Sequence, residues 1–132
     1  MPACRTIGLG ASAGGLEALE DFFQHIPPAP GCAFVLVMHL DPHHKPLLAE
    51  LLTRHTALQA MQAEEGMAIA PDHIYIIPPN SLITQHQGVL KLTRAPVRRS
   101  MRHPIDEYFT SLARDMAHEA VGIVFSGAGN DG

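Results

Sequence analysis

Cysteine is scarce in this sequence, which holds only Cys4 and Cys32 among its 132 residues. Two cysteines are too few for the disulfide framework of a small secreted protein, and their separation lacks metal-ligand spacing. Each precedes an apolar stretch, so the two thiols could lie close together. We expect both to be reduced and structurally passive.

An excess of positive charge and a long apolar run are also absent. Nine Lys and Arg side chains face 13 Asp and Glu, for a net charge of −4 at pH 7, so the bulk charge attracts neither nucleic acid nor an anionic membrane. No apolar run approaches the roughly 18 residues of a membrane-spanning helix, and no signal-peptide pattern opens the chain. We expect a cytoplasmic protein with no nucleic acid partner and no membrane insertion.

Metal-ligand spacing is missing as well. His39, Asp41, His43 and His44 crowd one proline-containing segment, but they follow no accepted ligand pattern. We predict that the protein binds no metal.

What the sequence does contain is a regular alternation of strand and helix patterns. Hydrophobic residues make up 46% of the chain and the mean hydropathy is +0.07, which fits one compact domain over residues 1–132. Short apolar runs predict strands over residues 6–10, 33–38, 74–77, 82–84, 89–92 and 121–125. Apolar residues at helical spacing predict helices over 16–26, 47–52 and 105–116. The predicted fold class is α/β, a doubly wound, mainly parallel sheet with helices on both faces and one hairpin.

The first predicted strand leads into a glycine-rich turn that carries a serine. In such sheets, ligands bind beyond the carboxyl ends of the strands. The segment Gly10-Ala11-Ser12-Ala13-Gly14 fits G-x-S-x-G, the sharp turn that lifts a serine hydroxyl clear of the sheet. A glycine-rich first turn also cradles phosphate in other proteins, so a nucleotide-binding module stays open as an alternative. The full dinucleotide pattern G-x-G-x-x-G fails, because position 13 is Ala.

The second and last predicted strands end in a histidine and an acid. His39 follows the strand over 33–38, and Asp131 lies in a glycine-rich segment after the strand over 121–125. Each residue alone is typical of a solvated loop or turn. Together with Ser12 they supply a nucleophile, a general base and a carboxylate that orients the base. The chain order Ser, His, Asp differs from that of α/β-hydrolases and of serine proteases, which indicates another serine-hydrolase lineage.

Four ordered blocks carry a resemblance to a known family. They are Gly10–Gly15, Val37–Leu40, Asp72–Asn80 and Ser126–Gly132. These blocks resemble the successive signatures of CheB-type protein-glutamate methylesterases. The resemblance implies an α/β hydrolase that removes methyl groups from glutamate γ-methyl esters on chemoreceptors and deamidates glutamine as a second activity, with no cofactor.

The resemblance also implies roles for individual residues. It makes Ser12, His39 and Asp131 the catalytic triad and the backbone N–H groups of Ala13 and Ala128 the oxyanion donors. Two positions depart from the family, which often has Thr where Ala13 stands and Met where Ala128 stands. We therefore expect an altered pocket wall around a retained reaction class. The rival hypothesis is a catalytically silent sensory or adaptor domain.

The implied partner is a methyl-accepting chemotaxis receptor or a similar methylated protein. The sequence that begins at His39 also resembles that of variants fused to a receptor methyltransferase and sensory modules. A basic stretch is either a solvated loop or a docking surface for an acidic receptor segment; its arginines are Arg94, Arg98, Arg99 and Arg102. The family continues for several elements beyond the last block, so we expect an incomplete catalytic domain that self-associates and turns over slowly.

Overall fold

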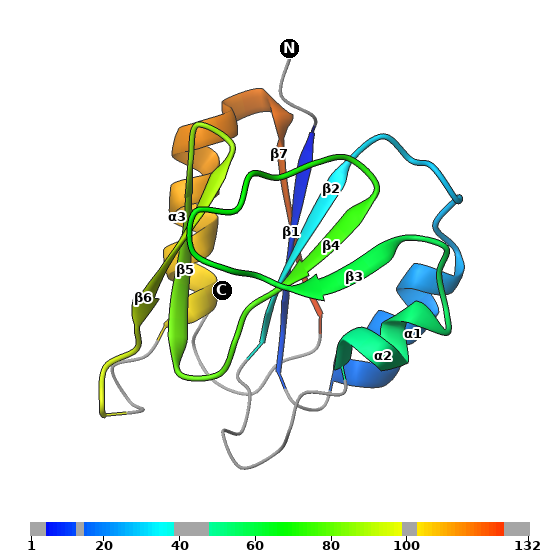
Figure 1. Ribbon diagram of the computed structural model, residues 1–132, viewed down its shortest axis with the longest axis horizontal. Helices are drawn as coiled ribbons and strands as arrows, with labels where there is room; N and C mark the ends of the chain where they lie inside the picture. The colour runs from blue at the N-terminus through cyan, green and yellow to red at the C-terminus, as the bar shows by residue number, and fades with distance from the viewer. Residues whose placement is uncertain (1–4, 13–14, 39–47, 99–102, 126–132) are drawn as a thin grey trace.

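The computed structural model describes residues 5–12, 15–38, 48–98 and 103–125 (Figure 1). The strands are β1 (Thr6–Ala11), β2 (Ala33–Met38), β3 (Gln59–Gln62), β4 (His73–Ile76), β5 (Ser81–His86), β6 (Val89–Arg94) and β7 (Ala120–Val124). The helices are α1 (Leu16–Gln24), α2 (Leu48–Thr53) and α3 (Pro104–Met116), followed by a short 3-10 helix, η3 (Ala117–Glu119). Within these ranges, no helix is long and apolar enough to cross a bilayer.

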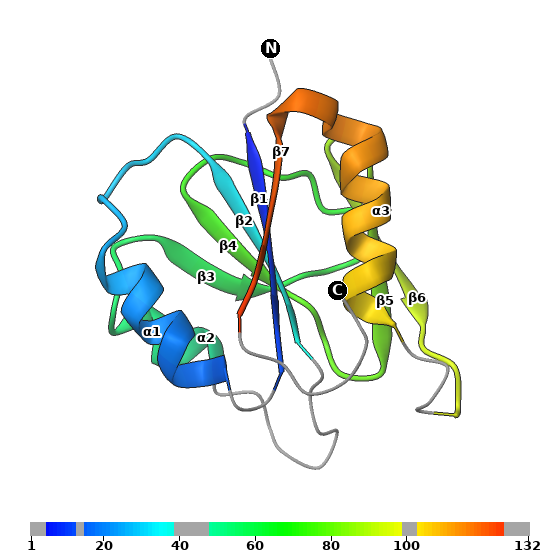
Figure 2. The ribbon, with the colours of Figure 1, turned by 180° about the vertical axis from the view of Figure 1, so that it is seen from behind.

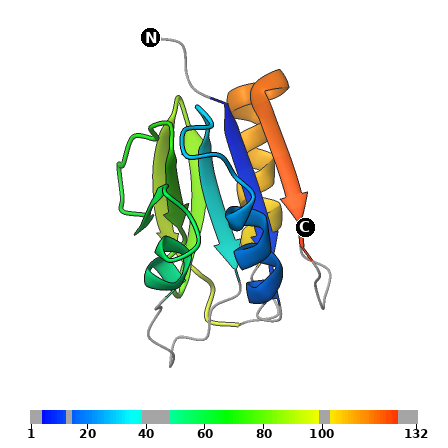
Figure 3. The ribbon, with the colours of Figure 1, turned by 90° about the vertical axis from the view of Figure 1, so that its right-hand side faces the viewer.

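Five strands form the central sheet, in the order β3-β4-β2-β1-β7, and β5 and β6 form a separate hairpin. All strand pairs of the central sheet are parallel. Helices α1 and α2 cover one face, while α3 and the hairpin cover the other (Figures 1 and 3). The predicted doubly wound α/β fold is therefore confirmed.

The apolar run of β2 is explained by burial on both faces. All six of its residues are buried. Successive strand side chains point to opposite faces, and accordingly Phe34 and Leu36 pack with α1 and α2, whereas Val35 and Val37 pack with α3 and the hairpin. A strand that buries both faces has no polar alternation, which is why its run is continuous.

Close packing of α3 on β1 depends on two strand glycines. A Cβ at Gly10 would lie 2.7 Å from Cγ2 of Ile105, and one at Gly8 would lie 3.0 Å from the rings of Tyr108 and Phe109. The early helix residue thus faces the end of β1 and the later ones face its start. Helix α3 therefore runs antiparallel to β1, and its first turn lies at the carboxyl edge of the sheet (Figure 2).

A polar network that is buried at Tyr108 and Gln85 and partly exposed at Asp115 fastens the hairpin to α3. The Tyr108 hydroxyl donates to Oε1 of Gln85 at 2.8 Å, and Nε2 of Gln85 donates to the Asp115 carboxylate at 3.0 Å. The same carboxylate accepts from the backbone N–H groups of Gln87 and Gly88 in the hairpin turn. The turn is thus held beside the end of α3, so the open end of the hairpin lies beside its start.

The network shifts two pKa values. Burial, assisted by the nearby Asp115 charge, raises the pKa of Tyr108 well above its ordinary value. Desolvation alone would raise the pKa of Asp115, but hydrogen bonds from Gln85, Gly88 and Gln87, together with the charge of His86, outweigh it and lower that pKa. Tyr108 therefore stays a donor and Asp115 stays an acceptor at neutral pH.

Candidate functional site

The carboxyl ends of β1 and β7 define the candidate site. Strand β1 lies between β2 and β7, with α1 following it on one face and α3 preceding β7 on the other. The strand order therefore changes direction at β1, which makes the β1/β7 pair the switch point of the sheet. In sheets of this kind, ligands bind beyond the carboxyl ends of the strands at such a point. The backbone N–H of Phe125 donates to the carbonyl of Gly10 at 2.8 Å and continues the pairing to the last residues of both strands.

Ser12 lies directly after β1, at this edge. It is half-buried, and its carbonyl accepts from the N–H of Gly15 at 2.8 Å, which closes a tight turn before α1 begins at Leu16. This is the strand–turn–helix context that the G-x-S-x-G prediction requires. Ala13 and Gly14 lie outside the described residues.

The other predicted site residues are not described. His39, Ala128 and Asp131 lie outside the described residues, so their roles stay predictions. The register does fix the strand ends before them: Ala11 pairs with Met38, the residue that precedes His39 in the chain. The segment that holds Asp41, His43 and His44 is likewise undescribed. Among the described residues, no three His, Cys, Asp or Glu side chains gather as metal ligands would.

The first turn of α3 is a part of the site region that sequence reasoning missed. Ile105 packs on Gly10, two residues before Ser12. His103 precedes the helix; its Nδ1 is inaccessible to solvent and has no hydrogen-bond partner among the described residues. Pro104 stands in the first turn with Asp106 and Glu107, where proline and negative charge suit a helix start. In the sequence, this segment carries only a helix-start pattern, which indicates where a helix begins and does not indicate a function.

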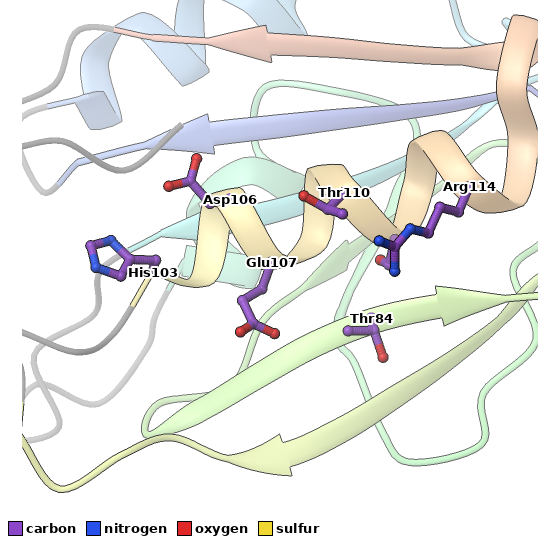
Figure 4. A pocket seen from close by; sticks show the side chains of 7 residues that line it. Thr84, His103, Asp106, Glu107, Thr110 and Arg114 are labelled. Carbon is purple, nitrogen blue, oxygen red and sulfur yellow. The ribbon is translucent and has the colours of Figure 1, made fainter.

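A polar pocket of about 490 Å³ extends along α3 from this turn. We call it the α3 groove; Thr84 of β5 lines one side, and His103, Asp106, Glu107, Thr110, Ser111 and Arg114 line the other. Figure 4 shows Glu107 reaching toward the hairpin, Asp106 reaching toward β1, and Arg114 running back along α3. The groove thus begins beside the end of β1 and continues away from it.

Two of the four predicted docking arginines are described. Arg94 ends β6 and is exposed, and so is Arg98. The N–H of Ala95 donates to the carbonyl of Asn80 at 2.9 Å, which keeps this segment at the open end of the hairpin. That end lies at the same end of the molecule as the end of β1 (Figure 1). Arg99 and Arg102 lie outside the described residues.

The sheet order and the serine turn at the switch point define a doubly wound α/β domain with a strand-end serine site. The model of the CheB methylesterase family matches residues 7–132, and the chain belongs to that family. This confirms the resemblance drawn from the four sequence blocks.

Curated relatives agree with this assignment, and a solved structure shares the fold. The chain is 35% identical to protein-glutamate methylesterase/protein-glutamine glutaminase 1 of Xanthomonas campestris pv. campestris, over 97% of this chain and 37% of that protein. It is 36% identical to the enzyme of the group 3 operon of Pseudomonas putida, over 96% of this chain and 38% of that protein. The crystal structure of the Thermotoga maritima CheB methylesterase catalytic domain matches with a TM-score of 0.84 and 21% identity, over 100% of this chain and 71% of that one. The chain spans little more than a third of these curated relatives, and the structural match supports the fold.

Proposed function

We propose that this chain belongs to a serine hydrolase that removes methyl groups from glutamate γ-methyl esters on chemoreceptors. The observation that carries the proposal is Ser12, held in a tight turn at the carboxyl end of β1 beside the β1/β7 switch point. The names of the similar proteins, protein-glutamate methylesterase/protein-glutamine glutaminase, supply the substrate class. Deamidation of glutamine is the second activity that this chemistry allows.

In the proposed reaction, the Ser12 hydroxyl attacks the ester carbonyl while His39 takes its proton. Asp131 holds the imidazole and stabilises its positive charge. Ala11 at the end of β1 pairs with Met38 at the end of β2. Ser12 follows Ala11 and His39 follows Met38, so the pairing supports the proposed roles of Ser12 as nucleophile and His39 as base. A serine hydroxyl needs such a base, since it is a weak nucleophile while protonated.

The tetrahedral oxyanion is stabilised by backbone N–H groups, for which we propose Ala13 and Ala128. Backbone donors survive a change of side chain, so the departures from the family at these two positions leave the donors in place. Methanol leaves with the proton from His39, and water then hydrolyses the glutamyl ester of Ser12. Glutamine would follow the same route and release ammonia. The cycle uses no metal and no organic cofactor.

The partner in this proposal is a methyl-accepting receptor or a similar methylated protein in the cytoplasm. The exposed Arg94 and Arg98, at the same end as Ser12, support a docking role for the stretch that also holds Arg99 and Arg102. Charge on such a rim mainly accelerates association with an acidic partner. Fusion to a methyltransferase and sensory modules remains part of the hypothesis.

The test is methanol release from a methylated receptor fragment. Ser12→Ala, His39→Ala and Asp131→Asn should each lower turnover by orders of magnitude, and the triple variant should lose little more than the worst single variant, because triad residues act as a unit. Circular dichroism would establish that each variant is folded. Turnover by Ser12→Ala at the rate of the parent would refute the proposed nucleophile.

A further inference from the structure

Two opposite charges in the α3 groove have no partners of their own. Among the residues that the structure describes, none forms an ion pair or a side-chain hydrogen bond with Glu107 or Arg114. Both are exposed; in Figure 4, Glu107 reaches toward the hairpin and Arg114 runs back along α3 in the direction of Glu107. Unpaired charges on opposite ends of one lined depression are available to a ligand.

The two charges are ordered with respect to the candidate site. Glu107 stands in the first turn of α3, two residues after the Ile105 that packs on Gly10. Arg114 stands in the last turn of the same helix. Seven residues of helix separate them by about 10 Å, and positions 107, 110, 111 and 114 share one face of a helix. Glu107 lies on the side of α3 opposite to Ile105, so this face of the groove is turned away from β1. The end of the groove nearest the site is marked by His103 and by Asp106, which reaches toward β1 in Figure 4, and Arg114 lies two helical turns away.

The walls of the groove suit a polar chain segment. Thr84 and Thr110 present hydroxyl groups between the two charges. Ser111 is committed to the fold, since its hydroxyl accepts from Gln85 and donates to the Tyr108 carbonyl. The network of Tyr108, Gln85 and Asp115 fixes β5 against α3. Because these elements are already fixed, binding in the groove does not carry the entropy cost of ordering the protein.

On the basis of the methylesterase function proposed above, we infer that the α3 groove docks the substrate segment that flanks the methyl ester. The ester side chain, which is neutral, lies beyond the end of the groove that His103, Asp106 and Glu107 line, toward Ser12. An acidic side chain farther along the same segment pairs with Arg114. A free carboxylate, which is the product, is repelled by Glu107. Arg114 is thus a specificity residue for an acidic segment and takes no part in the chemistry.

The experiment compares Arg114→Glu with Arg54→Glu. Arg54 is exposed directly after α2, on the opposite face of the sheet, so both variants change the net charge equally and both lose a cation at a helix end. Arg114→Gln serves as the milder variant, because Arg114 also suits the carboxyl end of α3 and its reversal lowers helix stability. Substrates are a methylated receptor fragment and 4-nitrophenyl acetate, a small ester that cannot reach Arg114.

We expect Arg114→Glu to raise KM for the receptor fragment about three- to tenfold, with kcat unchanged, and Arg114→Gln to raise it less. Added salt should raise the KM of the parent, affect that of Arg114→Gln less, and lower that of Arg114→Glu, because salt screens attraction and repulsion alike. Turnover of 4-nitrophenyl acetate should be the same in all four proteins. Equal KM values for Arg114→Glu and Arg54→Glu would overturn the groove assignment and leave the proposed hydrolase function intact. Absence of Ser12-dependent methanol release in the parent would refute both.

Discussion

The two faces of the central sheet are packed by different means. On the α1 face, Phe22, Phe23, Phe34 and Phe125 meet edge to face, with ring centroids 5.1 to 6.2 Å apart. On the α3 face, strand glycines admit the helix, and a network of Tyr108, Gln85 and Asp115 fastens the hairpin. An apolar face tolerates small shifts, whereas a network of hydrogen bonds fixes one geometry. The more sharply specified face is the one that borders the α3 groove.

Removing a ring from the apolar face should have the largest effect on stability. Phe23 is fully buried against Phe22 and Phe34. Phe23→Ala should lower the free energy of unfolding by about 3–5 kcal/mol, through lost transfer energy and a cavity. Phe109→Ala removes the same ring from the half-buried edge of the α3 face and should cost clearly less. Urea unfolding of the two variants measures the difference, and a cost for Phe109→Ala equal to that of Phe23→Ala would erase the contrast.

Removing one hydroxyl tests the polar face. Tyr108→Phe should cost about 1–3 kcal/mol, because Oε1 of the buried Gln85 loses its donor. In a Gln85→Ala background the same substitution should cost much less, since the partner is already absent. Urea unfolding of the four proteins closes this double-mutant cycle. Equal costs in both backgrounds would show that the hydroxyl contributes nothing through Gln85.

A smaller effect should appear as a difference in acid sensitivity. Because the pKa of Asp115 is lowered in the folded protein, its stabilising contribution is complete above its ordinary pKa and is lost as the pH falls through the folded value. The parent should therefore exceed Asp115→Asn in stability at pH 6, and the gap should shrink toward pH 3. Asp21→Asn makes the same charge change on exposed α1 and serves as the control. A gap that is constant with pH, or one that Asp21→Asn reproduces, would contradict the role of the Asp115 charge.

The sequence predicts most of this fold because burial leaves a simple mark. A strand covered on both faces is continuously apolar, as in β2, and prolines stand near the boundaries of the predicted helices. Strand β3 is missed because it pairs only with β4 and exposes both of its glutamines, so it carries no apolar run. Strand β3 forms because it pairs with β4, and the residues of β3 themselves do not indicate that pairing.

The parts of the candidate site also differ in how well the sequence predicts them. The strand and helix that flank Ser12 can be predicted because adjacent residues encode them, and β1 and α1 lie where the motif requires them. The catalytic role of Ser12 stays a prediction. The α3 groove could not be predicted, because Thr84 meets Glu107 and Arg114 only after the hairpin folds back on the helix. Sites built from one segment leave a motif, whereas those built from packing leave none.

Covalent labelling of Ser12 tests the central claim most directly. The parent protein and Ser12→Ala would be incubated with a fluorophosphonate, followed by intact-mass measurement and peptide mapping. Because an activated serine attacks phosphorus while an ordinary hydroxyl does not, the account predicts one adduct per chain, on Ser12, and none in Ser12→Ala. Unmodified parent, or an adduct that persists in Ser12→Ala, would contradict the assignment of Ser12 as the nucleophile.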